Sequence, residues 1–121
     1  MRHKKKIRKL SRNKSHRKSL IRNMAISFFL HKKLKTTEAK AKELKSTVEK
    51  IITLGKKGDV QSYRRINSIL NYPKVLKNIK EIAEKYKDRQ GGYTQIIKLF
   101  HRRGDSARQV LIKLVEQWNP I

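Results

Sequence analysis

The sequence predicts an α/β domain (α+β in the stricter sense) of two layers: a helix, a strand, three helices and a β-hairpin, preceded by an extended basic N-terminal arm. Apolar residues recur at three- to four-residue spacing in four segments between residues 15 and 87, which indicates amphipathic helices. Segments 93–100 and 109–115 are rich in β-branched and aromatic residues, which indicates strands. A chain of 121 residues is also long enough for one domain with a buried core.

Residues 1–14 are predicted to form the arm, and residues 15–121 the single domain. Cations crowd the arm, and Ile7 and Leu10 are almost its only apolar residues. Such a segment cannot bury enough apolar surface to fold by itself. Blocks of like charge are typical of nucleic-acid-binding segments. A solvated tail that keeps the protein soluble is the alternative interpretation.

The first helix is predicted over residues 15–33. Ser15 is a candidate N-cap, because its hydroxyl can accept a hydrogen bond from an unpaired backbone N–H. Met24 and Phe28 belong to a wide apolar face that repeats every four residues, so we expect them in the core. Residues 34–37 then have the composition of a short strand.

Three further helices are marked by their start and stop signals. Thr37 can cap the second helix, and Gly55 with Gly58 predicts its end. Asp59 is a good N-cap for the third helix. Pro73 suits the first position of the fourth helix, because its fixed φ is already helical and its missing N–H would be unpaired there anyway. Gly91-Gly92 is expected to end the helical part of the chain.

The last part of the chain predicts a hairpin. The two strand-like segments are joined by residues 101–107, in which Gly104-Asp105 is a turn signal. A hairpin of this size is not stable alone and must pack on the helices. Trp118 is expected to cover the edge of the core.

The net charge is +24, from 33 lysines and arginines against nine carboxylates, and it predicts a polyanionic partner. Nucleic acid and an anionic membrane are the candidates. The absence of cysteine fits a reducing compartment. The apolar run 24–30 is too short to span a bilayer, and no secretory signal is apparent. A mitochondrial transit peptide is a lesser alternative, because residues 1–37 lack Asp and Glu and are rich in Arg, Lys and Ser.

No catalytic or metal-binding constellation was found in the sequence. The histidines are His3, His16, His31 and His101, and none has a partner at metal-ligand spacing. The serines near the N-terminus lack a placed base and an orienting acid. Gly91-Gly92 is not a phosphate-binding loop, because no Gly-Lys-Ser/Thr follows it. We therefore expect no enzyme, no metal and no cofactor.

Short motifs spread over nearly the whole chain resemble one family, the bacterial large-subunit ribosomal proteins numbered seventeen. Each motif is weak alone, but they occur in the expected order and at suitable spacing. Gln95 departs from the pattern, since an arginine usually follows Gly-Gly-Tyr-Thr. The matching motifs are Met1-Arg2-His3, Ser15-His16-Arg17, Arg22-Asn23-Met24, His31 followed by Lys35-Thr36-Thr37, Lys40-Ala41-Lys42-Glu43-Leu44, Ile52-Thr53-Leu54, Gly91-Gly92-Tyr93-Thr94 and Gly104-Asp105.

The resemblance implies a structural constituent of the large ribosomal subunit in the cytoplasm. It implies binding to large-subunit ribosomal RNA near the outer end of the polypeptide exit tunnel, contacts with neighbouring ribosomal proteins, and no catalytic role. It also implies the same order of elements that the periodicity predicts. A match that begins at Met1 argues against a transit peptide.

The predicted RNA-binding residues are mainly those of the arm and of the first helix. Arginine can hold a phosphate with two donors, whereas lysine acts as a point charge. Histidine can stack on unpaired bases, and asparagine can contact base edges or 2′-hydroxyls. The full set is Arg2, His3, Lys4, Lys5, Lys6, Arg8, Lys9, Arg12, Asn13, Lys14, Ser15, His16, Arg17, Arg22, Asn23, Lys35, Thr36, Thr37, Arg102 and Arg103.

Two other functions remain open from the sequence. An architectural DNA-binding protein would use the same arm in a groove, and competition between folded ribosomal RNA and DNA of equal length distinguishes the two. A membrane-surface protein would use the helix over residues 20–30, although that apolar face is needed for the core. Helix capping is an equal alternative for Thr36 and Thr37, and a solvated surface is expected for Lys45 and Lys77.

Overall fold

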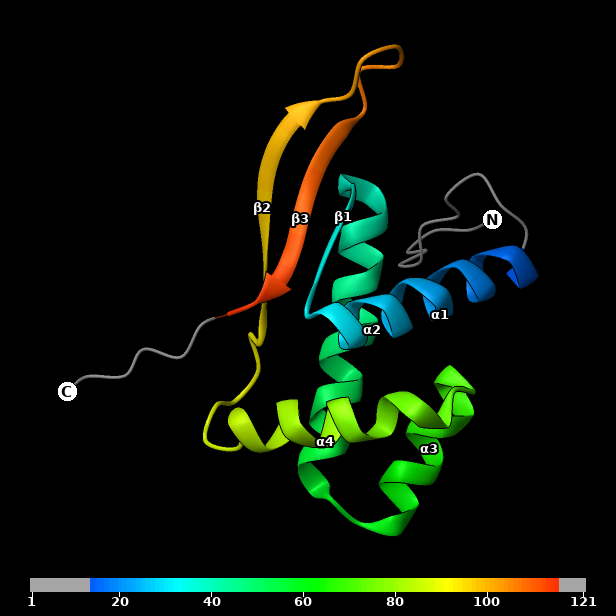
Figure 1. Cartoon of the computed structure of the whole chain (residues 1–121), viewed down its shortest axis with the longest axis vertical. Helices are drawn as coiled ribbons and strands as arrows, with labels where there is room; N and C mark the ends of the chain where they lie inside the picture. The colour runs from blue at the N-terminus through cyan, green and yellow to red at the C-terminus, as the bar shows by residue number, and fades with distance from the viewer. Residues whose placement is uncertain (1–13, 116–121) are drawn as a thin grey trace, which may run out of the picture.

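The computed structural model describes residues 14–115, and its elements confirm the predicted α+β class and order (Figure 1). The arm up to residue 13 and Trp118 lie outside the described residues. The elements are α1 (Lys14–His31), β1 (Lys33–Thr37), α2 (Glu38–Lys57), α3 (Val60–Leu70), the 3-10 turn η1 (Pro73–Val75), α4 (Leu76–Lys85), β2 (Thr94–His101) and β3 (Arg108–Leu114).

The three strands form one antiparallel sheet in the order β1-β3-β2. The predicted hairpin is therefore present, and β1 joins it by pairing with β3, with Leu34 opposite Ile112. Along β3, Val110, Ile112 and Leu114 are buried while the residues between them face the other way. One face of the sheet thus belongs to the core, as the two-residue period of a strand requires.

The pairing of β2 with β3 contains a bulge. Lys98 lies opposite Val110 and His101 lies opposite Arg108, so two residues of β2, Leu99 and Phe100, face the single residue Gln109. A bulge of this kind bends the strand and changes the direction of the side chains beside it.

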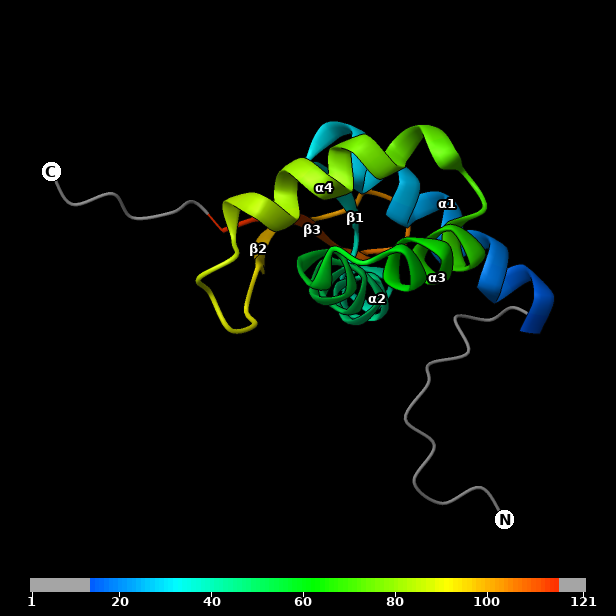
Figure 2. The ribbon, with the colours of Figure 1, turned by 90° about the horizontal axis from the view of Figure 1, so that it is seen from below.

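α2 packs against α1, α3 and α4, and Figure 2 shows it nearly end-on with α3 beside it. It buries the predicted stripe that includes Leu44, Val48 and Ile51. Phe28 and Phe29 of α1 are completely buried, with their ring centroids 5.6 Å apart in an edge-to-face arrangement. The prediction of a core position is therefore confirmed for Phe28, and Met24 is partly buried against the same core.

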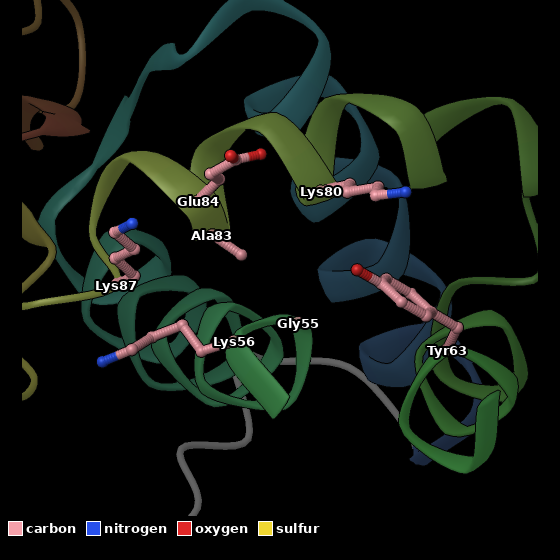
Figure 3. Close-up of a pocket in the computed structure, with 7 residues that line it drawn as sticks. All are labelled: Gly55, Lys56, Tyr63, Lys80, Ala83, Glu84 and Lys87. Atoms are coloured by element: carbon pink, nitrogen blue, oxygen red, sulfur yellow. The ribbon is translucent and has the colours of Figure 1, made fainter. Parts of the chain in front are cut away.

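Gly55 has a different role from the one predicted. It lies inside α2, which continues to Lys57 and ends at Gly58, where φ is +68°. A Cβ atom on Gly55 would be 3.2 Å from Ala83 Cβ and 3.2 Å from Ile79 Cγ2 of α4. Figure 3 shows Ala83 pointing from α4 toward this part of α2. The glycine allows the two helices to cross closely.

Four predicted helix starts differ in outcome. Asp59 is confirmed as the N-cap of α3, because its carboxylate accepts a hydrogen bond of 2.7 Å from the Ser62 backbone N–H. Thr37 occupies the N-cap position of α2, but its side chain makes no capping hydrogen bond. Ser15 as an N-cap is wrong, since α1 is already helical at Lys14. Pro73 begins η1, which leads into α4 one turn later.

The end of the first helix is also corrected. α1 stops at His31, two residues earlier than predicted, because Lys32 adopts a left-handed conformation with φ of +65°. A left-handed residue cannot continue a right-handed helix, so the chain turns and Lys33 enters β1.

Glu49 connects α2 to the start of the hairpin. Its carboxylate accepts hydrogen bonds from the Gly92 backbone N–H at 3.2 Å and from Thr94 Oγ1 at 2.8 Å. Beside it, Lys56 Nζ donates to the Tyr93 hydroxyl at 2.9 Å. These bonds fix the hairpin against the helical layer.

Candidate nucleic-acid interface

Positive charge without any carboxylate extends along α1 and β1. Residues 14–37 contain seven lysines and arginines and no Asp or Glu. The N-terminal half of α1 projects beyond α2 (Figure 1), and Lys14, His16 and Lys18 in it are exposed. Its C-terminal half is anchored by Phe28 and Phe29. The buried C-terminal half of α1 therefore holds in place a basic N-terminal half that is accessible to a partner.

A groove of about 460 Å³ follows the basic half of α1 where it faces α2. Glu43 is its single acidic residue, against four cations. The groove is lined by Lys14, Arg17, Lys18, Ile21, Glu43, Ser46, Thr47 and Lys50. A second hollow of about 300 Å³ adjoins it and shares Lys18 and Ile21 with it. A mainly cationic groove of this kind suits a phosphate-bearing chain better than an apolar ligand.

Arg22 of α1 is held by a hydrogen bond to another helix. Its side chain is half-buried, and Nε donates a hydrogen bond of 3.3 Å to the Ile69 carbonyl of α3. This bond ties α1 to α3. A phosphate contact from Arg22 stays a prediction. Because Nε is already bonded to Ile69, such a contact has to be made by the Nη groups.

The residues predicted on β1 have different environments. Lys35 is exposed, and its Nζ lies 4.8 Å from the ring centroid of Phe100 on β2. Thr36 and Thr37 are half-buried, and Thr36 pairs with buried Val110 on the core side of the sheet. Of the three, Lys35 is the most available to a ligand.

The hairpin turn places two arginines at the end of the molecule farthest from α3 and α4 (Figure 1). Arg102 binds Asp105 through one edge of its guanidinium group, with an Nε–Oδ1 bond of 3.1 Å and a bond from Nη2 to Oδ2. This guanidinium, with the Ala107 backbone N–H, lowers the pKa of Asp105 from 3.8 to about 2. Arg103 is exposed beside the pair. The tip and α1 are separate basic surfaces.

Part of the predicted set has no structural description. These residues belong to the arm, and the proposal for them stays a sequence prediction: Arg2, His3, Lys4, Lys5, Lys6, Arg8, Lys9, Arg12 and Asn13.

A third basic hollow was not predicted from the sequence. It has a volume of about 210 Å³ where α2, α3 and α4 meet, and the residues around it are drawn in Figure 3. Lys80 and Lys87 contribute cations and Glu84 a carboxylate. The ammonium group of Lys56 points away from the hollow, because it donates hydrogen bonds to the Tyr93 hydroxyl and the Arg89 carbonyl. Its lysines do not converge on one point, so it is a minor feature of the charged surface.

Over residues 14–115, no cluster of three or more His, Cys, Asp or Glu side chains could hold a metal ion. Within that range, too, no helix is long and apolar enough to cross a bilayer.

The chain matches one protein family over most of its length. The model of the family described as ribosomal protein L17 matches residues 20–115. The chain belongs to the ribosomal protein L17 family. The resemblance seen in the sequence motifs is therefore confirmed.

Curated members of the L17 family are similar over almost the whole chain. The large ribosomal subunit protein bL17 of Magnetococcus marinus is 51% identical over 119 residues, which cover 97% of this chain and 94% of that protein. The bL17 protein of Desulfitobacterium hafniense is 52% identical over 109 residues, covering 89% and 97%. That of Syntrophotalea carbinolica is 50% identical over 118 residues, covering 97% and 76%.

Proposed function

We propose that the chain is a structural constituent of the large ribosomal subunit in the cytoplasm, which it joins by binding large-subunit ribosomal RNA. The arm and α1 form the main contact. One observation carries this proposal. Residues 14–37 contain basic residues and no carboxylate, and the C-terminal half of α1 within them is anchored in the core while the N-terminal half is exposed. The names of the L17 relatives support the large subunit as the setting.

The attraction between the basic side chains and the RNA phosphates drives binding. Each lysine or arginine that neutralises a phosphate releases condensed counterions, so the affinity falls steeply with salt. α1 is held by Phe28, Phe29 and the Arg22–Ile69 bond, so its cations are positioned before RNA arrives. Preorganisation of this kind lowers the entropy that is lost on binding.

The site within the subunit is a finer part of the proposal. A position near the outer end of the exit tunnel, with neighbouring ribosomal proteins as further partners, follows from the family resemblance. The role is architectural: the chain positions RNA segments and makes or breaks no covalent bond.

Charge neutralisation on α1 tests the contact. In Lys14→Gln/Lys18→Gln, we expect weaker binding to large-subunit ribosomal RNA and a log K versus log salt slope shallower by about one to two, because each lost phosphate contact contributes about 0.7–0.9. Both lysines are exposed and line the groove between α1 and α2. Filter binding of the full chain at several salt concentrations measures the slope.

Lys77→Gln/Lys80→Gln on α4 is the matched control, since it removes the same charge from two exposed lysines on another helix. It should change the affinity and the slope less. Equal losses in the two pairs would show that net charge, and not the α1 surface, determines binding.

A further inference from the structure

The sheet has one face that the helical layer does not cover. Strand alternation puts Val110, Ile112 and Leu114 toward the helices, so their neighbours Leu111 and Lys113 face outward. We define the open sheet face by six outward residues of the three strands: Lys33, Lys35, Ile97, Phe100, Leu111 and Lys113.

Large apolar side chains are exposed on this face. Phe100 is 56% exposed and Ile97 is 38% exposed, although neither is needed in the core. The bulge after Lys98 creates this arrangement, because it places Phe100 on the same side as Lys35, whose Nζ is 4.8 Å from the ring centroid. An exposed aromatic ring beside a cation is a recurring means of binding unpaired bases.

The charges of the open sheet face have one sign. Its charged residues are Lys33, Lys35 and Lys113, which lie around the apolar centre formed by Leu111 and Ile97. This combination is complementary to a nucleotide, in which a flat apolar base is joined to an anionic phosphate. A neighbouring basic protein would be repelled by the same lysines.

Gln109 gives a second, independent indication of a ligand. It alternates with Val110 and therefore points to the outer side, opposite the bulge residues Leu99 and Phe100. It is only 8% exposed, and among residues 14–115 its Nε2 has no hydrogen-bond partner. A buried donor without an acceptor costs free energy. Neighbouring side chains cover Nε2 itself, so a base edge or a 2′-hydroxyl supplies the missing acceptor only after these side chains move aside on binding.

We propose that the open sheet face is a second RNA contact, separate from α1, in which an unpaired base of ribosomal RNA stacks on Phe100. Lys35 and Lys113 bind the phosphates on either side of that base, and Gln109 donates to its edge or ribose. The inference rests on the proposed function, because it takes RNA as the partner. It adds a sequence-tolerant stacking site to a contact made otherwise by phosphates.

Substitution of Phe100 tests the stacking. We expect Phe100→Ala to weaken binding of the full chain to large-subunit ribosomal RNA about tenfold, while the slope of log K against log salt stays unchanged. Phe100→Trp should bind at least as tightly as the wild type. Val60→Ala removes a 65%-exposed apolar side chain from α3 and should leave the affinity unchanged. Lys35→Met should instead make the slope shallower, because it removes a phosphate contact.

Ultraviolet cross-linking of the wild-type complex provides a measurement that does not depend on any variant. The proposal predicts that the RNA-linked peptide contains Phe100. Recovery of RNA-linked peptides from α1 alone would overturn it, as would Phe100→Ala binding with the affinity of Val60→Ala.

Two other results have distinct meanings. If Phe100→Ala binds free RNA normally but leaves the large subunit at lower salt than the wild type, the face docks on a neighbouring protein, and the RNA assignment is wrong. If the wild-type chain does not bind ribosomal RNA, the proposed function itself fails. Wild-type binding together with an unaffected Phe100→Ala variant rejects the second contact alone.

Discussion

At the scale of single residues, the two arginines of the hairpin turn show how neighbours of the same type differ in availability. Arg102 is bound to Asp105 through two hydrogen bonds, whereas Arg103 beside it is exposed. The ion pair closes the turn between β2 and β3. Arg103 is therefore the better candidate for a phosphate contact at this tip.

The pair predicts a pH effect on the turn. The pKa of Asp105 is about 2 in the folded chain and 3.8 ordinarily, so its stabilising contribution is complete above pH 3.8 and is lost as the pH falls toward 2. We expect the carboxyl NMR signal of Asp105 to titrate near 2 in the wild type. In Arg102→Ala the midpoint should move up toward 3.8. The control Arg103→Ala should keep the low midpoint, and an unchanged midpoint in Arg102→Ala would disprove the pairing.

Predictions for single residues were correct where residues close in sequence determine the contact. Asp59 caps α3 as expected, because a carboxylate that accepts an N–H three residues on is specified within one turn. Ser15 failed as a cap, because Ser11, Asn13 and Ser15 all have capping side chains and the sequence does not choose among them. The contact of Lys35 with Phe100 was missed, because it joins two strands that are distant in sequence.

At the scale of elements, the periodicity predicted which segments are helices and strands but not how they pack. β1 pairs with β3, about 75 residues later, and no local pattern specifies that partner. The bulge that exposes Phe100 depends on the register between β2 and β3, which the strand composition does not contain. Gly55 looked like part of a helix stop because the close approach of α4 is a tertiary feature.

The crossing of α2 and α4 gives a prediction about stability. Gly55→Val adds a branched side chain where a Cβ alone would already be 3.2 Å from Ala83 and Ile79, so the helices must separate. We expect the free energy of unfolding to fall by about 1–3 kcal/mol. Urea denaturation followed by circular dichroism measures this change.

Ser46→Val is the control for the Gly55 prediction, because Ser46 is exposed on the same helix. Its effect should stay within about 0.5 kcal/mol of the wild type. If Gly55→Val were as stable as the wild type, the two helices would not be in close contact at this point.

At the scale of the whole molecule, the chain presents separate cationic surfaces from one small core. α1 extends from one side and the hairpin tip from one end (Figure 1), and the open sheet face is formed by outward residues of all three strands. A net charge of +24 opposes compact folding and favours association with a polyanion. Several surfaces on one rigid body suit a folded RNA junction, which brings several strands together, better than a regular duplex.

The composition was therefore enough to predict a polyanionic partner, and the motifs were enough to predict the family. The sequence could not predict the site in three dimensions, because the grooves beside α1 and the face around Phe100 are produced by packing. The sequence alone shows that residues 14–37 contain lysines and arginines but no Asp or Glu. The division of this stretch into a buried anchor and an open basic half needed the structure.

Competition between two nucleic acids for the full chain tests most directly whether it recognises folded ribosomal RNA. Folded large-subunit ribosomal RNA and duplex DNA of equal length compete for the protein at several salt concentrations, and both carry the phosphates that a purely electrostatic binder would accept. We expect the ribosomal RNA to win at every salt concentration, because positioned surfaces select a folded shape. Equal binding of RNA and DNA, with parallel salt dependence, would contradict it.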